Sequence, residues 1–374
     1  MDHRPPHPSH RHVGEPRLPL LAVPFALIAV VTVVDVLAPP DVHLGPFLVA
    51  APALTASFAG PWMTGFVGAV AVTAQAAVAV VRTTATDLNH TFQIIALVLI
   101  SIFVTLFAHL REVHEKQLTQ LRSVAEAAQE VVLRPLRDRM GPLRLASVYL
   151  AAEAEAQIGG DLYAATRTPH GTRLIIGDVR GKGLEAVGDA ALVLGAFRAA
   201  AHQEADLPTL IAHLEAAVAA DPDPDGTGEP AGEPGEAFTT AAVLDVPDQD
   251  MTLRLISCGH PPPLLLRGGR AIPLEVDHPA PPLGLTQYVD TGFAPQSFSF
   301  EPGDVVLLYT DGVIEARDAE GAFYPLPERA ADRPGDGPDA LLRHLCADLL
   351  AHSPGGRLGD DAAMVAIERI GGGA

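Results

Sequence analysis

The chain has 374 residues, with 45 acidic and 25 basic side chains and a formal net charge of −20. At roughly 150 residues per domain, this length predicts two or three structural units. The acidic excess argues against a nucleic-acid partner, because a phosphate backbone would be repelled and no basic stripe offsets the repulsion. Only two cysteines occur, Cys258 and Cys346, so the sequence offers neither a disulfide framework nor a cysteine zinc site.

The first third has the composition of a membrane domain. No Asp, Glu, Lys or Arg occurs in the forty residues Val42–Val81, and Gly60-Pro61 divides them into two stretches of about membrane-spanning length. Two further apolar runs, Leu18–Ala38 and Phe92–Leu110, flank this segment. We therefore expect an all-α, four-helix transmembrane domain over residues 18–110.

Basic residues predict the orientation of these spans. Six of them lie just outside the first and last spans, against a single one, Arg82, in a loop on the other side. The positive-inside rule then places the tail, residues 1–17, and everything after the fourth span in the cytoplasm. The sequence predicts a multi-pass protein of the cell membrane that contacts membrane lipid. The six residues are Arg4, Arg11, Arg17, Arg111, Lys116 and Arg122.

A helical connector is expected over residues 111–133, which contain no Gly or Pro and are rich in Glu, Gln, Leu and Ala. Its apolar residues recur at three- and four-residue spacing, which forms a seam along one helix face. The seam is compatible with a parallel coiled coil that makes the protein a homodimer, and equally with one amphipathic helix packed on its own domain. The seam residues are Leu121, Val124, Ala128 and Val131.

Short strands and paired helices follow over residues 134–370. Strands at hairpin spacing mixed with helices predict an α+β domain, with helices packed on a mainly antiparallel sheet. The acidic stretch Asp221–Glu236, rich in Pro and Gly, is expected to be disordered. Strands are predicted at Leu143–Leu150, Thr172–Ile176, Thr239–Val246, Thr252–Ser257, Leu264–Arg267, Val305–Tyr309 and Ala362–Ile367, and helices at Leu184–Ala201, Leu207–Ala220 and Pro338–His352.

Four aspartates stand beside glycine where strands are expected to stop: Asp161, Asp178, Asp311 and Asp360. A rigid strand fixes a carboxylate, and glycine lets backbone and ligand approach closely. Several carboxylates without a Cys or His motif describe a site for hard cations such as Mg²⁺ or Mn²⁺. Two such ions can activate a bridging water and clamp a phosphoryl group during in-line attack.

Each motif alone also has a simpler interpretation. Asp311-Gly312 fits a hairpin turn, Gly159-Gly160-Asp161 fits a bulge, and Gly359-Asp360-Asp361 fits a polar loop before an edge strand. Gly181–Ala186 matches the pattern G-x-G-x-x-A of dinucleotide sites. Because Asp178 would face the pyrophosphate there, we disfavour nucleotide binding.

Six sequence blocks follow one another from about Leu133 to Ile370: QIGGDLY (157–163), GDVRGKGLEA (177–186), FTTAAVLDV (238–246), CGHPPPLLL (258–266), GDVVLLYTDGVIEARDAEGAFY (303–324) and GDDAAMVAI (359–367). In order and spacing they resemble the metal-dependent serine/threonine phosphatases, the PPM or protein phosphatase 2C-like family, and specifically its bacterial SpoIIE-like branch. The resemblance implies two stacked antiparallel β-sheets flanked by helices, an αββα sandwich, with two Mn²⁺ or Mg²⁺ ions at one edge.

The resemblance also implies roles for single residues. Asp178 would bridge both ions, and the carbonyl of Val179 would complete the first metal site. Asp311 and Asp360 would hold the second ion, and Asp161 would support the cluster directly or through water. Catalysis would depend on Asp178 and Asp311 through the water that the ions activate.

Other positions are assigned supporting roles. Asp361 would stand behind the ligands, and Gly181 and Gly183 would lie near the phosphate. His260 is expected to stabilise its loop, and Cys258 to be buried and inert. The arginine that contacts phosphate in eukaryotic relatives has no matching motif, so the phosphate-binding group stays unassigned.

The resemblance implies a phosphoserine or phosphothreonine protein as substrate, often a STAS-type anti-anti-sigma factor. The chain is thus expected to be a membrane-anchored protein phosphatase of bacterial signalling. The competing hypothesis is a membrane scaffold that binds a regulatory partner through a non-hydrolytic phosphatase-like domain. The presence of all four aspartates argues against it, and metal binding separates the two hypotheses.

Overall fold

The computed structural model divides the chain into two compact units, Met1–Gln120 and Leu121–Ala374. The division falls within the predicted connector. The tail, Arg82 and the whole acidic stretch Asp221–Glu236 lie outside the described residues, so the expectations for them stay predictions. The structure describes residues 18–39, 44–81, 88–152, 159–204, 206–219, 238–286, 292–332 and 337–371.

Helices form the first unit. Its elements are α1 (Leu18–Leu37), the 3₁₀ helix η1 (Gly45–Val49), α2 (Ala50–Phe58), α3 (Pro61–Val81) and the start of α4 (Leu88–Val132). A small core of apolar side chains joins them, while many large apolar side chains, including Trp62 at 92% exposure, point outward. Outward-facing apolar side chains on helices suit lipid as the surrounding solvent, because helices satisfy their own backbone hydrogen bonds.

The predicted count of four spans is not confirmed. Among the described residues, three helices are long and apolar enough to cross a membrane: Leu20–Leu37, Pro61–Val81 and Thr91–Gln117. The segment predicted as the second span is Gly45–Phe58, which is shorter than the roughly 20 residues that a spanning helix needs. The reason is local, since Gly45-Pro46 opens η1 and Gly60-Pro61 separates α2 from α3.

The short segment nevertheless runs alongside α3 in the opposite direction. Gly45 approaches Gln75, and Pro52 approaches Gly68. Between α3 and α4, Gln75 Nε2 donates to Gln93 Oε1 at 3.0 Å, and Gly65 approaches Thr105. The helix α4 is therefore also antiparallel to α3. The first unit therefore has four segments of alternating direction.

The predicted connector, residues 111–133, coincides with the C-terminal part of α4, which continues without interruption to Val132. The side chains of Leu121, Val124, Ala128 and Val131 lie outside the described ones. The coiled-coil and single-helix interpretations of the seam therefore both stay predictions.

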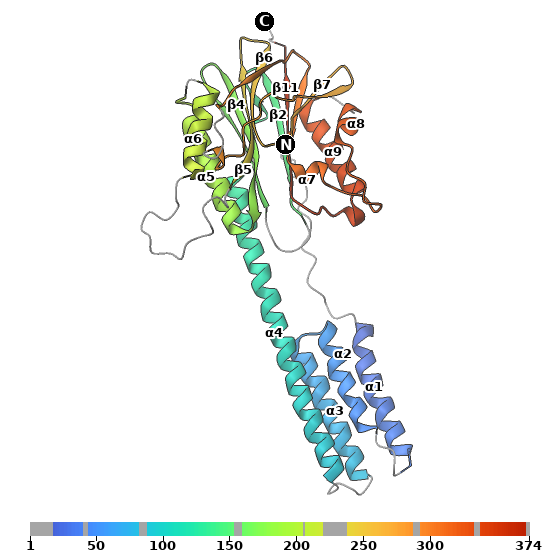
Figure 1. The fold of residues 1–374 in the computed structure, drawn as a ribbon. Helices are drawn as coiled ribbons and strands as arrows, with labels where there is room; N and C mark the ends of the chain where they lie inside the picture. The colour runs from blue at the N-terminus through green and yellow to red at the C-terminus, as the bar shows by residue number, and fades with distance from the viewer. Residues whose placement is uncertain are drawn as a thin grey trace, which may run out of the picture. The chain divides into compact units, whose positions relative to one another are not determined.

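Two antiparallel sheets form the second unit (Figure 1). The six-stranded sheet has the order β1-β2-β11-β10-β7-β8, and the five-stranded sheet has the order β3-β4-β5-β6-β9. The strands are β1 (Arg139–Met140), β2 (Leu143–Leu150), β3 (Gly159–Arg167), β4 (Gly171–Lys182), β5 (Thr239–Pro247), β6 (Thr252–Cys258), β7 (Leu264–Arg267), β8 (Arg270–Pro273), β9 (Gln296–Ser299), β10 (Val305–Tyr309) and β11 (Ala362–Arg369).

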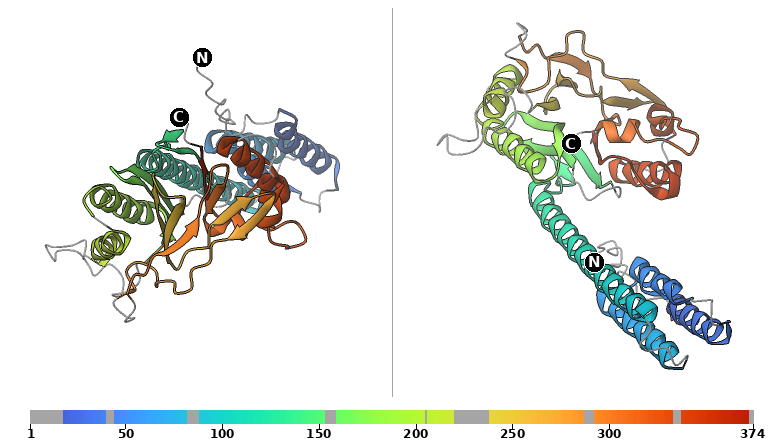
Figure 2. Two further views of the ribbon diagram at one scale, coloured as in Figure 1. Left: turned by 90° about the horizontal axis from the view of Figure 1, so that it is seen from above. Right: turned by 60° about the horizontal axis from the view of Figure 1, so that its bottom comes forward.

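Helices cover the outer faces of the two sheets (Figure 2). The helices α5 (Leu184–Ala200) and α6 (Leu207–Ala219) pack on the five-stranded sheet. The six-stranded sheet is covered by α7 (Asp311–Ile314), α8 (Leu326–Ala331) and α9 (Pro338–His352), with the 3₁₀ helix η3 (Pro354–Gly356) following. The predicted α+β class and αββα sandwich are confirmed.

Successive side chains of a strand point to opposite faces of the sheet, and this alternation explains the layering. In β10, Val306 and Leu308 face the core between the sheets, whereas Val305, Leu307 and Tyr309 face the core beneath α9. Both faces of the strand are buried, which is why its sequence is apolar throughout and not alternating.

Candidate functional site

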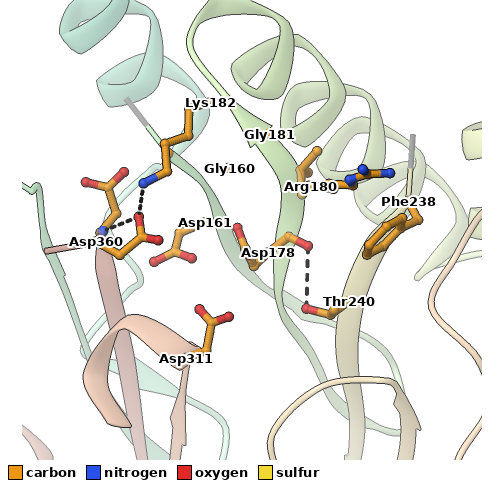
Figure 3. A pocket seen from close by; sticks show the side chains of 13 residues that line it. Gly160, Asp161, Asp178, Arg180, Gly181, Lys182, Phe238, Thr240, Asp311 and Asp360 are labelled. Atoms are coloured by element: carbon orange, nitrogen blue, oxygen red, sulfur yellow. Dashed lines mark hydrogen bonds and ion pairs between the residues drawn. The ribbon is translucent and has the colours of Figure 1, made fainter. Parts of the chain in front are cut away.

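A cavity of about 320 Å³ lies where the two sheets meet at one edge (Figure 3). It is lined by nearly all the residues that the sequence singled out, although they are up to 200 positions apart. Gly183 is the exception: it caps the N-terminus of α5 and does not line the cavity. The lining residues that were predicted are Asp161, Asp178, Val179, Gly181, Asp311, Asp360 and Asp361.

Asp161 and Asp178 come from neighbouring strands. Asp161 is the third residue of β3 and Asp178 lies within β4, where the two are register partners. The expectation that every aspartate stands where a strand stops is therefore wrong for these two. The register shifts between Gly159 and Asp161, so the bulge interpretation of Gly159-Gly160-Asp161 is correct as well, and it is part of the site.

The other aspartates flank strands of the second sheet. Asp311 follows β10 and is the first residue of α7, so Asp311-Gly312 begins a short helix and is not a hairpin turn. Asp360 and Asp361 directly precede β11. Because β10 and β11 are antiparallel neighbours, the end of one and the start of the other meet at the same edge.

Glycines allow these segments to approach one another. A Cβ atom at Gly160 would lie 2.4 Å from the carbonyl oxygen of Val179, and one at Gly312 would lie 1.9 Å from the carbonyl oxygen of Asp361. A Cβ atom at Gly159 would lie 2.0 Å from Asp361 Oδ2. At Gly160 and Gly312 the opposing atom is a backbone carbonyl oxygen that cannot swing aside, so only glycine fits at these two positions.

Burial and mutual repulsion perturb the carboxylates. Burial, followed by the charge of Asp178, raises the pKa of Asp161 well above its ordinary value. Burial, followed by the charges of Asp311 and Asp360, raises the pKa of Asp178 to about 7. Burial also raises the pKa of Asp311 and of Asp361. Burial is thus the first cause of the raised pKa values, and the neighbouring carboxylate charges are the second.

Thr310 orients one of the aspartates and was not predicted. Its fully buried hydroxyl donates to Asp161 Oδ2 at 2.8 Å and accepts from the backbone N–H of Ala363 at 2.9 Å. It thereby joins β3 to the six-stranded sheet. The signal available in the sequence was its place directly before Asp311.

His260 links the two sheets beside the cavity. Its Nε2 lies 3.1 Å from the carbonyl oxygen of Tyr309, which can only accept, so Nε2 carries the proton. Nδ1 then accepts from the hydroxyl of Thr240 at 3.0 Å. Burial lowers the pKa of His260 to about 4, so the ring is neutral at physiological pH. The expected structural role fits this pairing, with the addition that the ring spans from β5 to β10.

Two cations line the rim of the cavity (Figure 3). The Arg180 guanidinium lies 5.3 Å from the ring centroid of Phe238. The Lys182 Nζ donates to Asp360 Oδ1 at 2.8 Å. Neither had been assigned a role, although both stand inside the block GDVRGKGLEA.

The donor set suits divalent cations. Five carboxylates against Arg180 and Lys182 leave a formal charge of −3, so one divalent ion leaves the cavity negative and two make it positive. Carboxylate oxygens are the ligands that Mg²⁺ and Mn²⁺ prefer. Among the described residues, no three His, Cys, Asp or Glu side chains stand close enough to enclose one ion. The cluster is therefore open, and its donor chemistry and negative charge suit divalent cations.

Residues 168–370 match the family described as stage II sporulation protein E, SpoIIE. This match covers more than half of the chain. The chain belongs to the SpoIIE family. The match begins directly after β3, so this strand, which carries Asp161, lies outside it.

Solved structures share the fold of this SpoIIE chain. The PP2C domain of SiaA from Pseudomonas aeruginosa is 16% identical with a TM-score of 0.55, over 68% of this chain and 98% of that one. The phosphatase domain and regulatory fragment of SpoIIE from Bacillus subtilis is 15% identical with a TM-score of 0.50, over 62% and 65%. At these identities, the two structures establish the fold.

A further structure contains the RsbU and RsbW domains of a Mycobacterium tuberculosis protein. It is 25% identical with a TM-score of 0.48, over 62% of this chain. The present chain covers 61% of that solved chain.

Proposed function

We propose that this chain is a membrane-anchored, metal-dependent protein serine/threonine phosphatase that acts on a phosphorylated regulatory protein. The observation that carries the proposal is the convergence of Asp161, Asp178, Asp311 and Asp360 on one open cavity. Membership of the SpoIIE family supports phosphoester hydrolysis. The three long apolar helices support the membrane anchor, with the second unit on the cytoplasmic side.

We assign the ligand roles to the residues that line the cavity. Asp178 and the carbonyl of Val179 would hold one ion, with Asp178 shared between both. Asp311 and Asp360 would hold the second ion, supported by Asp161, with Asp361 standing behind them. Two Mn²⁺ or Mg²⁺ ions would supply the positive charge that attracts a phosphate dianion, and would activate a water for attack on phosphorus.

The chain's own residues prepare this chemistry. Thr310 fixes the position of Asp161, and His260 holds β5 and β10 together without carrying charge itself. The cavity is open to solvent on the side of Lys182 and Asp360, whose side chains are about half exposed. A phosphorylated side chain of a protein partner can therefore enter from this side.

The test uses the full chain in detergent with a phosphoserine protein, including a STAS-domain phosphoprotein, and with an aryl phosphate. Hydrolysis should require Mn²⁺ or Mg²⁺ and should stop with a chelator. Asp178→Asn should lower the rate by about 10³-fold or more, because it removes the shared ligand. Asp277→Asn, an exposed carboxylate outside the cavity, is the matched control and should keep the wild-type rate.

Hydrolysis that survives a chelator, or wild-type activity of Asp178→Asn, would overturn the proposal. A folded protein that binds Mn²⁺ and hydrolyses none of these substrates would instead favour the scaffold hypothesis.

A further inference from the structure

Lys182 is an unusual residue in this chain. The sequence has only two lysines, Lys116 and Lys182, and its other 23 basic side chains are arginines. Lys182 ends β4, four residues after Asp178, and lies in the wall of the cavity. A lysine ammonium is a compact point charge on a flexible stem, whereas arginine presents a planar fork. The positive charge beside Asp360 is thus a compact ammonium on a flexible side chain.

The Lys182 ammonium forms an ion pair with Asp360, which is a predicted metal ligand. Nζ donates to Asp360 Oδ1 at 2.8 Å, and the same oxygen accepts the backbone N–H of Asp361 at 3.0 Å (Figure 3). A divalent ion at Asp360 would meet this ammonium at close range. The ion pair and a metal–ligand bond would place two cations beside one carboxylate, and the repulsion between these cations makes the two interactions compete.

The surroundings of Lys182 leave it room to move. Its side chain is 41% exposed, and it stands between Gly181 and Gly183. Both glycines have positive φ, and a Cβ atom at either would meet no described atom within 4 Å. Arg180, by contrast, is stacked on Phe238 at the opposite rim. Lys182 is therefore the cation that can leave its partner while staying beside the cavity.

We propose that Lys182 is an exchangeable counter-cation of the metal centre. It pairs with Asp360 while the ions are absent, gives Asp360 up when they bind, and then contacts an oxygen of the incoming phosphoryl group. This inference rests on the proposed function, and it assigns the phosphate-binding group that the motifs leave open.

The two halves of this role predict opposite effects of removing the charge. Lys182→Met removes a competitor from Asp360, so Mn²⁺ should bind about three- to tenfold more tightly. The same variant removes a phosphate contact, so KM for a phosphorylated substrate and the inhibition constant of inorganic phosphate should both rise about three- to tenfold. Lys182→Arg keeps the charge and should restore both values toward wild type. A residue that only supported the fold would weaken both kinds of binding.

The experiment measures Mn²⁺ binding to the full chain in detergent by isothermal titration calorimetry. Binding of inorganic phosphate to the Mn²⁺-loaded protein is measured alongside the steady-state kinetics. Arg343→Gln is the matched control, because Arg343 is exposed and pairs with Asp339 on α9, away from the cavity. It removes one positive charge and should leave both affinities unchanged. Thermal unfolding of every variant checks that it is folded.

Tighter Mn²⁺ binding together with weaker phosphate binding in Lys182→Met supports the inference. Unchanged Mn²⁺ affinity, or weaker binding of both Mn²⁺ and phosphate, overturns the inference. Both binding measurements work without turnover, so they decide the role of Lys182 even if no substrate is hydrolysed. If the wild type hydrolyses phosphoesters and Lys182→Met has the same Mn²⁺ and phosphate affinities as the wild type, only this inference is refuted. If the wild type binds no Mn²⁺, the proposed function is refuted as well.

Discussion

Asp161 and Asp178 are direct register partners on the antiparallel strands β3 and β4, so their carboxylates share one face of the sheet. Like charges at directly opposed positions destabilise a sheet, and here both groups are also largely shielded from water. An arrangement of this kind is expected where positive charge from outside the protein compensates the repulsion. The pairing is thus the part of the fold that most directly supports the proposed metal site.

The first prediction concerns pH. Because the pKa of Asp178 is raised to about 7, the metal-free folded state holds a proton that the unfolded state has already lost at that pH. This contribution to stability is present below the ordinary pKa of 3.8 and is lost as the pH rises through 7. The Tm of metal-free Leu121–Ala374 should therefore fall between pH 5 and pH 8, and Asp178→Asn should flatten that fall.

Metal binding should show the opposite slope. An ion competes with the proton on Asp178, so Mn²⁺ affinity should rise with pH up to about 8 and then level off. Calorimetry in two buffers of different ionisation enthalpy would detect the proton released. An affinity that is independent of pH from 6 to 8 would contradict this picture.

The second prediction concerns Thr310. Thr310→Val keeps the shape but leaves Asp161 Oδ2 and the N–H of Ala363 without their partner, which should cost about 1–3 kcal/mol of stability. Mn²⁺ affinity should fall about tenfold, since Asp161 loses its orientation. Thr310→Ser retains the hydroxyl and should bind Mn²⁺ like the wild type. Urea unfolding measures the stability and calorimetry the Mn²⁺ affinity. If Thr310→Val and Thr310→Ser have the same stability and the same affinity, the hydroxyl does not orient Asp161.

The third prediction concerns the glycines. Gly312→Ala would place a Cβ atom 1.9 Å from the carbonyl oxygen of Asp361, and backbone cannot yield as a side chain can. We expect a loss of at least about 2 kcal/mol in the free energy of unfolding, with displacement of Asp361. Gly188→Ala is the control, because Gly188 is exposed in α5 and has open space around it. It should gain about 0.5–1 kcal/mol.

The fourth prediction concerns membrane topology. The alternating directions of α1, η1–α2, α3 and α4 bring the start of α1 and the continuation of α4 to the same end of the first unit. Reporters fused before α1 and after Arg122 should therefore both register as cytoplasmic. If Gly45–Phe58 does not cross the membrane, three spans remain and the two reporters will lie on opposite sides.

Several elements were determined by the sequence itself. The strands Leu143–Leu150, Leu264–Arg267 and Val305–Tyr309 and the helix Pro338–His352 have the bounds that were predicted. Each of them begins directly after a proline, a glycine or an aspartate, so its start is signalled locally. The aspartates of the site were likewise visible, because each stands beside glycine within a recognisable block.

Only the tertiary structure decided the rest. The strand β3 begins with Gly-Gly-Asp and contains two alanines, which have little strand propensity, so its strand conformation comes from pairing with β4. The short helix α7 stands where a hairpin turn was the simpler interpretation of Asp311-Gly312, since Gly312 packs against the backbone of Asp361. The pairing of Lys182 with Asp360 joins residues 178 positions apart. Local sequence cannot encode such a contact, because it exists only once the edges of the two sheets have met.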